Sequence, residues 1–194
     1  MCGRYQFSAF KSPEVSWITE AVERQYGPGA WTPGDVRPGD RAPVLLPGEG
    51  DRPAVGLFTW GYPSENRKII NARAETAAVK PMFQEGVQRK RCVIPSTGFY
   101  EWDGQKRKYL FKVPGSDTVY MAGVYEQYTG KPHFCILTTE ANVSVREVHH
   151  RMPLVLTGEQ VTGWLGGGPA ASGLLSSTPP ALEKESQEAQ LSLW

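Results

Sequence analysis

The sequence contains few cysteines and histidines, and this scarcity argues against several kinds of site. It has three cysteines, Cys2, Cys92 and Cys135, and three histidines in 194 residues. The cysteines are far apart and form no CxxC pair, so the sequence supports neither a disulfide framework nor a zinc ribbon. We therefore expect reduced thiols, no metal site and no cofactor.

Long apolar runs and a surplus of one charge are also absent. No stretch of about 18 uninterrupted apolar residues occurs, and the N-terminal region becomes polar at Lys11 without the hydrophobic segment of a signal peptide. The formal net charge of +1 indicates nothing about nucleic acid by itself, because binding depends on where basic residues cluster. We expect a cytoplasmic monomer without membrane contact, associated with the nucleoid if the source is bacterial.

The composition is that of one folded domain followed by a tail. Hydrophobic residues make up 40% of the chain and aromatic residues 11%, which is enough for one hydrophobic core. We predict a domain over residues 1–165. The segment 166–194 is rich in Gly, Pro and Ser and then polar, a composition that does not favour regular structure.

Most of the chain after residue 53 has the pattern of short strands separated by turn residues. Because several neighbouring strands are joined by short turns, the pattern favours antiparallel pairing. The predicted fold class is therefore α+β, with a mainly antiparallel, curved or barrel-like sheet and a few flanking helices. Strands are expected at 54–60, 91–95, 98–102, 108–113, 118–125 and 133–139.

The spacing of apolar residues predicts helices on either side of these strands. Ser12 can cap a helix that ends at Tyr26. Residues 27–53 are rich in proline and glycine, so we expect a long ordered loop there. Further helices are expected at 75–88, 141–148 and 157–165.

Cys2 is the first residue with distinctive chemistry. If Met1 is removed, Cys2 presents an α-amine and a thiol on adjacent carbons, with ordinary pKa values of about 7.7–8.0 and 8.5. Such an amine condenses with an aldehyde to a Schiff base, and the thiol can then close on the imine carbon to give a thiazolidine. Alternatively, the thiol alone could attack an acyl carbon. Judged from the N-terminus alone, an accidental cysteine is the simpler interpretation.

Three further stretches contain polar residues suited to orienting or protonating a reacting group. INARAET (70–76) offers an amide at Asn71 and a guanidinium at Arg73. GFYEW (98–102) sets Glu101 among aromatic residues, which favours a raised carboxyl pKa, and VHHRMPLVL (148–156) contains two adjacent histidines. Each stretch taken alone is also compatible with an ordinary helix entrance, exposed strand or surface turn.

Taken in order, MCGRY, WG followed by INARAET, CVIPSTGFYEW and HHRMPLVL resemble the SRAP family, named for SOS-response-associated peptidases. The resemblance runs from residue 2 to about residue 156. It implies a DNA-damage function, in which the protein senses abasic sites in single-stranded DNA and traps them as a covalent crosslink through the N-terminal cysteine. The crosslink shields the lesion from strand cleavage.

The resemblance also implies a role for each matched residue of the reaction centre. Cys2 would be the nucleophile that gives both the Schiff base and the thiazolidine, and Asn71 would hold the N-terminal residue or the sugar in place. Glu101 would handle protons during imine formation. His149 would protonate the sugar oxygen, whereas His150 occupies a variable position and is given no role.

The DNA contacts are predicted from residue type within the matched motifs. Arg4, Arg73 and Arg151 would hold phosphates, while Trp60 and Trp102 offer faces on which bases stack. The basic triplets at 89–91 and 106–108 either extend this surface or form ordinary solvated faces. The linker YPSENRKI (62–69) is shorter and less aromatic than expected of the family, so one side of the DNA groove is expected to differ.

Three other activities remain open from the sequence. The protein could be a cysteine-type peptidase, including one that removes its own Met1, although a cellular aminopeptidase also accepts a residue as small as cysteine. It could bind single-stranded DNA without covalent chemistry. A lyase activity is also accessible, because a Schiff base at the sugar permits β-elimination.

Overall fold

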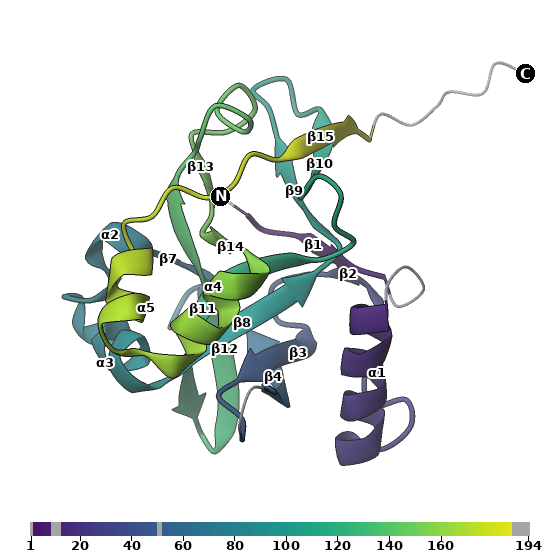
Figure 1. Cartoon of the computed structure of the whole chain (residues 1–194), viewed down its shortest axis with the longest axis vertical. Coiled ribbons are helices and arrows are strands. Elements are labelled where there is room, and N and C mark those ends of the chain that lie inside the picture. Colours follow the sequence, from purple (N-terminus) through teal and green to yellow (C-terminus); the bar gives the residue numbers. More distant parts are fainter. Residues whose placement is uncertain (1, 9–12, 50–51, 188–194) are drawn as a thin grey trace, which may run out of the picture.

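The computed structural model describes residues 2–8, 13–49 and 52–187. Its centre is a closed barrel of five strands (Figure 1). The pairs run β12–β4–β3–β8–β11, and β11 pairs with β12 to close the ring. All of these pairs are antiparallel except β12–β4, which is parallel. The barrel strands are β3 (Arg41–Leu46), β4 (Ala54–Trp60), β8 (Arg91–Ser96), β11 (Val119–Tyr128) and β12 (Lys131–Glu140).

Short strands extend the barrel wall and bring distant motifs together. β7 (Asn71–Arg73) runs parallel to β12, and β13 (Arg151–Pro153) runs antiparallel to it. Thr138 of β12 is the partner of both Arg73 and Pro153. The INARAET motif in β7 and the HHRMP motif in β13 therefore both pair with the same barrel strand, β12. β14 (Val155–Leu156) pairs with β11, and β5 (Tyr62–Pro63) pairs with β6 (Lys68–Ile69).

A second antiparallel sheet holds the N-terminal strand beside the FYEW motif. Its order is β15 (Glu183–Ser186), β10 (Lys108–Lys112), β9 (Gly98–Trp102), β1 (Tyr5–Phe7) and β2 (Gly34–Val36). Tyr5 is paired with Phe99, and the Tyr100 N–H donates to the Arg4 carbonyl at 2.9 Å. This register brings the start of the chain close to Glu101.

Helices cover the outside of the barrel. α1 (Pro13–Tyr26) packs against β3 and β4 through Val15, Ile18 and Val22. α4 begins with a capping box in which Thr157 and Gln160 bond each other reciprocally, an arrangement that stabilises a helix start by about 1 kcal/mol. The other helices are α2 (Ala74–Ala77), α3 (Pro81–Arg89), α4 (Gly158–Gly166) and α5 (Gly168–Leu174).

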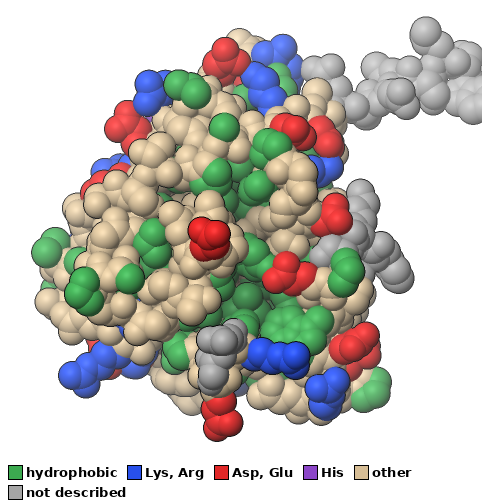
Figure 2. Space-filling model, in the orientation of Figure 1, with side chains coloured by type: hydrophobic (Ala, Val, Ile, Leu, Met, Phe, Trp, Pro, Cys, Tyr) green, Lys and Arg blue, Asp and Glu red, His purple; other side chains and the backbone are tan. Residues whose placement is uncertain are grey.

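The surface between α4 and the start of α1 is hollowed. Figure 2 shows hydrophobic side chains at the floor of this hollow, where Leu45, Tyr120, Leu156 and Val161 line a cavity. Within the described part of the chain, no helix is long and apolar enough to cross a membrane. The same residues contain no group of three His, Cys, Asp or Glu side chains placed to hold a metal ion.

The predicted fold class is confirmed, and most predicted strands and α1 lie where expected. The prediction of a loop over residues 27–53 was wrong, because this segment contains β2 and the barrel strand β3. Pro43 lies within β3, in an otherwise apolar run. A proline has no backbone N–H to donate to a neighbouring strand. It is tolerated at this position because β3 pairs with β8 only at Leu45, so few hydrogen bonds are made on that side.

Two predicted helices also differ from the structure. The helix expected at 75–88 is divided into α2 and α3, because Lys80 adopts an extended conformation before Pro81 at the start of α3. Residues 141–148 form turns instead of a helix. The Asn142 side chain accepts hydrogen bonds from the Ser144 N–H and hydroxyl and donates to the Pro179 and Pro180 carbonyls, which competes with helix formation.

The segment after residue 166 has more regular structure than its composition favours. It forms α5 and β15, and β15 pairs with β10 at four positions. The Lys112–Glu185 ion pair at 2.7 Å adds a side-chain contact to this pairing. Residues 188–194, and the Ser12 cap expected for α1, lie outside the described residues.

Candidate functional site

Cys2 and Asn71 are in direct contact, although they are 69 residues apart in the chain. The Asn71 side-chain amide Nδ2 donates to the Cys2 carbonyl at 2.9 Å. Cys2 is fully buried, and its Sγ lies 3.7 Å from the Arg4 carbonyl oxygen. The Asn71 Oδ1 atom is buried and has no hydrogen-bond partner among the described residues. This oxygen can therefore accept a hydrogen bond from an amine or a sugar hydroxyl that enters the site.

Glu101 lies on β9 close to the Cys2 thiol. Its side chain is almost completely buried, with 2% of the residue exposed. Burial raises the pKa of the Glu101 carboxyl from 4.5 to about 7, so both the acid and the carboxylate are populated near neutral pH. The pKa of the Cys2 thiol is raised as well, first by burial and then by the Glu101 carboxylate. The thiol is therefore neutral in this environment.

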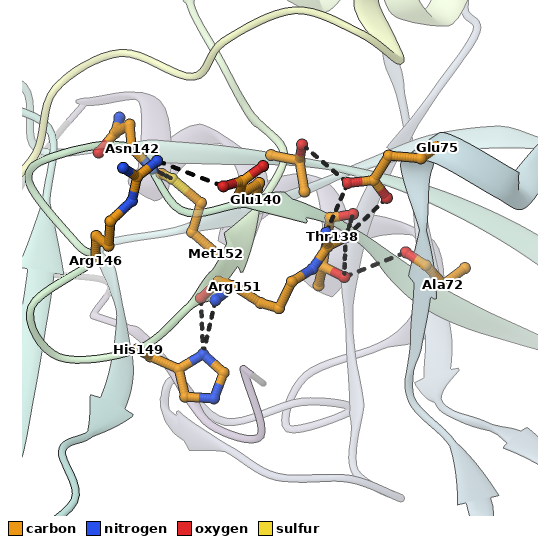
Figure 3. A network of polar contacts seen from close by, with 10 residues as sticks. Ala72, Glu75, Thr138, Glu140, Asn142, Arg146, His149, Arg151 and Met152 are labelled. Atoms are coloured by element: carbon orange, nitrogen blue, oxygen red, sulfur yellow. Dashed lines mark hydrogen bonds and ion pairs between the residues drawn. The ribbon is translucent and has the colours of Figure 1, made fainter.

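His149 is held in an orientation that suits both of its protonation states. Its Nδ1 lies 3.0 Å from both the backbone nitrogen and the carbonyl oxygen of Arg151 (Figure 3). A neutral Nδ1 can accept from the Arg151 N–H, and a protonated Nδ1 can donate to the Arg151 carbonyl. The ring can thus gain or lose a proton without turning, which suits a proton shuttle.

The ring of His150 stacks on that of His149, with centroids 4.4 Å apart and an interplanar angle of 28°. The pKa of His149 is lowered mainly by burial. The pKa of His150 is lowered first by the charge of His149, with smaller contributions from Arg151 and Arg73. A positive charge on His149 therefore opposes protonation of His150.

An NMR titration can test this coupling, because the chain has only three histidines to assign. We expect His149 and His150 to titrate below the ordinary value of about 6.5 and His149→Phe to raise the pKa of His150. The phenyl ring preserves the stack but removes the neighbouring positive charge. The His133 signal serves as the internal reference. An unchanged His150 midpoint in His149→Phe would show that the two rings do not interact electrostatically.

Arg151 is engaged within the protein, and its contact with a phosphate stays a prediction. Its Nη1 and Nη2 atoms lie 2.6 and 2.9 Å from the two carboxylate oxygens of Glu75, and Nη2 also donates to the Thr138 carbonyl at 2.6 Å (Figure 3). Only 13% of the Arg151 side chain is exposed. The guanidinium fixes β13 to α2 and β12, and so supports the position of His149.

Trp60 does not offer a stacking face, so this prediction was wrong. The residue is completely buried at the end of β4. Its indole Nε1–H donates to the Ile70 carbonyl at 3.0 Å, and its ring packs against Phe134 and Tyr5 with centroids 6.2 and 5.2 Å away. The ring is therefore enclosed by the core.

Arg4 and Trp102 remain together at the surface of the second sheet. The Arg4 guanidinium lies 5.7 Å from the centre of the Trp102 ring and 4.0 Å from the Asp35 carboxylate. The Lys108 ammonium lies 3.6 Å from the centre of the Tyr100 ring on the neighbouring strands. Cations and aromatic rings thus alternate on this face, and contacts of these residues with DNA stay a prediction. Arg73 is exposed on β7.

Two residues of the basic triplet at 89–91 are engaged within the protein. Lys90 forms ion pairs with Glu126 at 2.6 Å and Glu85 at 3.0 Å. Arg91 donates to the carbonyls of Val87, Gln88 and Trp164. Both side chains therefore stabilise the fold. In the triplet at 106–108, Arg107 is paired with Asp103 at 2.6 Å, and Lys108 lies over Tyr100.

Sequence reasoning missed Tyr5, which lies directly behind the reaction centre. Its hydroxyl is buried and has no hydrogen-bond partner in the described part of the chain. The pKa of Tyr5 is raised by burial and then by the neighbouring Cys2. The MCGRY motif contains Tyr5, but its alternation along β1 gave no sign that a hydroxyl without a partner would be buried near Cys2.

Comparison with known proteins identifies the family of this chain. The profile of the family described as SOS response associated peptidase (SRAP) matches residues 1–191. The abasic site processing protein YoqW of Bacillus subtilis is 32% identical, with 85% of this chain and 80% of that protein covered. The abasic site processing protein YedK of Escherichia coli is 30% identical, with 85% and 79% covered. A crystal structure of a Bacteroides thetaiotaomicron protein aligns with a TM-score of 0.75 at 25% identity, covering 95% of this chain and 91% of that one.

The family match extends beyond the motifs to include α5 and β15. It therefore covers both the barrel and the second sheet. The chain belongs to the SOS response-associated peptidase (SRAP) family.

Proposed function

We propose that this protein processes abasic sites in DNA by forming a covalent crosslink to a single-stranded lesion through Cys2 after Met1 is removed. The main support is the buried cluster in which Asn71 holds the Cys2 carbonyl and Glu101 lies beside the Cys2 thiol with a pKa of about 7. The names of its relatives, abasic site processing proteins, agree with this activity.

The reaction begins with opening of the abasic sugar. His149 donates a proton to the ring oxygen as the bond between this oxygen and C1 breaks, and the C1 hydroxyl gives its proton to water to leave the aldehyde. The two contacts of His149 Nδ1 with the Arg151 backbone support this step, because a hydrogen bond is possible whether or not Nδ1 carries a proton. The same residue can act in reverse when the adduct is released.

The Cys2 amine then attacks the aldehyde carbon. Its thiol is neutral because burial raises the thiol pKa, so the amine is the better first nucleophile. The carbinolamine loses water with a proton supplied by Glu101, which leaves an imine. The sulfur adds to the imine carbon and the thiol proton moves to nitrogen, closing the thiazolidine. The sequence releases one water overall, and closure removes the imine from which a lyase would cleave the strand.

A peptidase acting on other proteins is less well supported by this geometry. A cysteine peptidase uses a thiolate as its nucleophile, whereas the pKa of the Cys2 thiol is raised by burial; the proposed crosslink begins with the amine and needs no thiolate. Removal of Met1 can occur through the protein itself or through a cellular aminopeptidase. The proposal needs only that the Cys2 amine becomes free.

Intact mass spectrometry tests the proposal directly. The purified protein should lack Met1, and mixing it with an abasic oligonucleotide should give a heat-stable species with the summed mass minus one water. Cyanoborohydride adds two hydrogens to a Schiff base but leaves a thiazolidine unchanged, so the mass after reduction distinguishes the two. Retention of Met1 in protein that forms the adduct, or the absence of any heat-stable adduct, would refute the proposal.

Arg73 is the exposed arginine of β7 and should bind a phosphate next to the lesion. We expect Arg73→Ala to weaken binding to single-stranded DNA and to make the dependence of log K on log salt shallower by about 0.7. Binding should be measured with a tetrahydrofuran abasic analogue, which has no aldehyde. Arg24→Ala, which removes an exposed charge from α1, is the matched control. A loss confined to particular sequences would contradict a phosphate contact.

A further inference from the structure

The side chain of Asn142 uses all of its hydrogen-bonding capacity within the fold. Its Nδ2 donates to the carbonyls of Pro179 and Pro180 at 3.0 and 2.9 Å. Its Oδ1 accepts from the backbone N–H and the hydroxyl of Ser144 at 3.0 and 2.6 Å. An asparagine amide has two donor hydrogens and two acceptor positions, so no capacity is left over. A fully satisfied amide of this kind holds its partners in one arrangement.

The partners of Asn142 belong to two segments that are far apart in the sequence. Residues 141–150 connect β12 to β13, and we call them the histidine loop because they end with the two adjacent histidines. Residues 179–182 lie between α5 and β15, and we call them the crossing segment (Figure 1). β15 pairs with β10, and β10 pairs with β9, the strand of Glu101. The crossing segment therefore leads from the histidine loop to the sheet that carries Glu101.

Two further contacts fasten this part of the chain to the histidine loop. The Leu182 N–H donates to the Ser144 hydroxyl at 3.0 Å, and the Leu182 side chain is buried in the core. Lys184 of β15 forms an ion pair with Glu147 at 2.6 Å, with side chains that are 40% and 78% exposed. An ion pair this exposed contributes little. The contacts of Asn142 and Ser144 are therefore the main attachment.

Inside the histidine loop, backbone hydrogen bonds connect Asn142 to His149. The Asn142 carbonyl accepts from the Val145 N–H at 3.1 Å, and the Val145 carbonyl accepts from the His149 N–H at 3.0 Å. The Ala141 N–H donates to the His150 carbonyl at 3.0 Å, which closes the loop at its base. A change in the position of Asn142 is therefore transmitted to His149 through two hydrogen bonds.

We propose that Asn142 is a positioning residue for the reaction: it holds the crossing segment on the histidine loop and so fixes the place of His149 relative to Glu101. This inference rests on the proposed function, because it takes His149 to be the proton donor in sugar opening. His149 precedes β13 of the barrel sheet, whereas Glu101 lies in the second sheet, so no direct strand pairing sets their separation. A misplacement of about 1 Å can slow a reaction by about 10²-fold.

The test compares two substrates that differ in the step assigned to His149. One oligonucleotide carries the natural abasic sugar, which must open before it reacts. The other carries an open-chain aldehyde that lacks the hydroxyl needed to close the ring. Asn142→Asp keeps the size of the side chain but places a carboxylate oxygen against two carbonyls. We expect it to slow adduct formation about ten- to a hundredfold on the natural sugar, and less than about twofold on the open aldehyde.

A second variant and a control make the comparison specific. Ser144→Ala removes the hydroxyl that contacts both Asn142 and Leu182, so it should have a smaller effect in the same direction. It also provides the test if thermal unfolding shows that Asn142→Asp is not folded. Gln160→Ala breaks the capping box of α4 instead and should leave the ratio of the two rates unchanged. Equal slowing on both substrates, or none on either, in a folded variant would show that Asn142 does not position His149.

A measurement without DNA separates this inference from the proposed function. The pKa of His149 is lowered mainly by burial, so a loosened histidine loop should move its NMR titration midpoint upward, towards about 6.5. We expect this shift in Ser144→Ala, which introduces no charge, and not in Gln160→Ala. If the wild type forms no adduct with either substrate, the crosslinking proposal fails, whereas a shifted midpoint would still support the link between the segment and His149. An unchanged midpoint in Ser144→Ala would reject that link.

Discussion

Replacement of Cys2 by alanine is expected to abolish the heat-stable DNA adduct while affinity for an abasic strand stays within about threefold of the wild-type value. The variant retains the α-amine once Met1 is removed, so it can still form a Schiff base. It has no sulfur to close the ring, and the imine remains open to hydrolysis. The predicted phosphate contacts come from other residues, among them Arg4 and Arg73, so binding should persist.

The readout combines intact mass with binding to a tetrahydrofuran analogue. Cys2→Ala should give an adduct only when cyanoborohydride is present. Cys135→Ala is a closely matched control, because Cys135 is also a fully buried free cysteine but lies in the barrel strand β12. It should form the adduct as the wild type does, provided that its thermal unfolding shows a folded protein. A heat-stable adduct of Cys2→Ala would contradict the thiazolidine.

Cys2→Ser separates trapping from strand cleavage. Its hydroxyl is a much weaker nucleophile than the thiol, so the imine should persist for longer. We therefore expect this variant to trap poorly and to nick the abasic strand more than the wild type, a difference visible on a denaturing gel. This outcome would identify ring closure as the step that protects the strand.

The second large effect is expected for Glu101→Gln, which keeps the shape of the side chain but removes its proton chemistry. Adduct formation should slow by about 10²- to 10⁴-fold, the usual contribution of a general acid or base. Affinity for an undamaged single strand should be nearly unchanged, because the residue is buried beside Cys2. The measurement is the single-turnover rate of adduct formation. An unchanged rate would remove Glu101 from the mechanism.

The same substitution should change how stability depends on pH. The pKa of Glu101 is about 7 in the folded protein against 4.5 as the ordinary value, so the folded state retains a proton that the unfolded chain has released. The stabilisation of the folded state by this proton chemistry is fully present below pH 4.5 and is lost as pH rises through 7. The loss amounts to up to about 3 kcal/mol in the free energy of unfolding.

Glu101→Gln has no carboxyl to ionise, so the variant does not undergo this loss of stability as pH rises. Relative to the wild type, the variant should therefore gain stability between pH 5 and pH 8, as measured by urea unfolding of the two proteins at both values. A difference between them that does not vary with pH would contradict the raised pKa. Together, a slower reaction and a relative gain in stability at high pH would distinguish a catalytic carboxyl from one that only supports the fold.

The sequence predicted the parts of the fold that depend on local patterns. Alternating apolar residues between turn signals were sufficient for β9 to β12, and helical spacing was sufficient for α1. β3 was missed because Pro43 resembles a loop signal, and only the short β3–β8 pairing makes it acceptable. The turns at 141–148 were missed because Asn142 bonds to carbonyls almost 40 residues away, at Pro179 and Pro180.

In the candidate site, too, the sequence could not predict contacts between side chains that are far apart in the chain. The motifs identified Cys2, Asn71 and Glu101, and the topology of the two sheets places these three residues together. An aromatic or basic residue inside a motif does not reveal its partner, however. Trp60 faces the core, and Arg151 is paired with Glu75, 76 residues away in the chain.

Because of the strand order of the second sheet, a tag at the N-terminal end is expected to affect the protein differently from a tag after β15. β1 is an interior strand with neighbours on both sides, whereas β15 lies at the outer edge (Figure 1). An affinity tag fused ahead of Cys2 would cap its amine and lead directly into the most enclosed part of the molecule. A tag attached beyond β15 begins at a sheet margin and leaves the Cys2 amine free, so it is the appropriate choice for producing the protein.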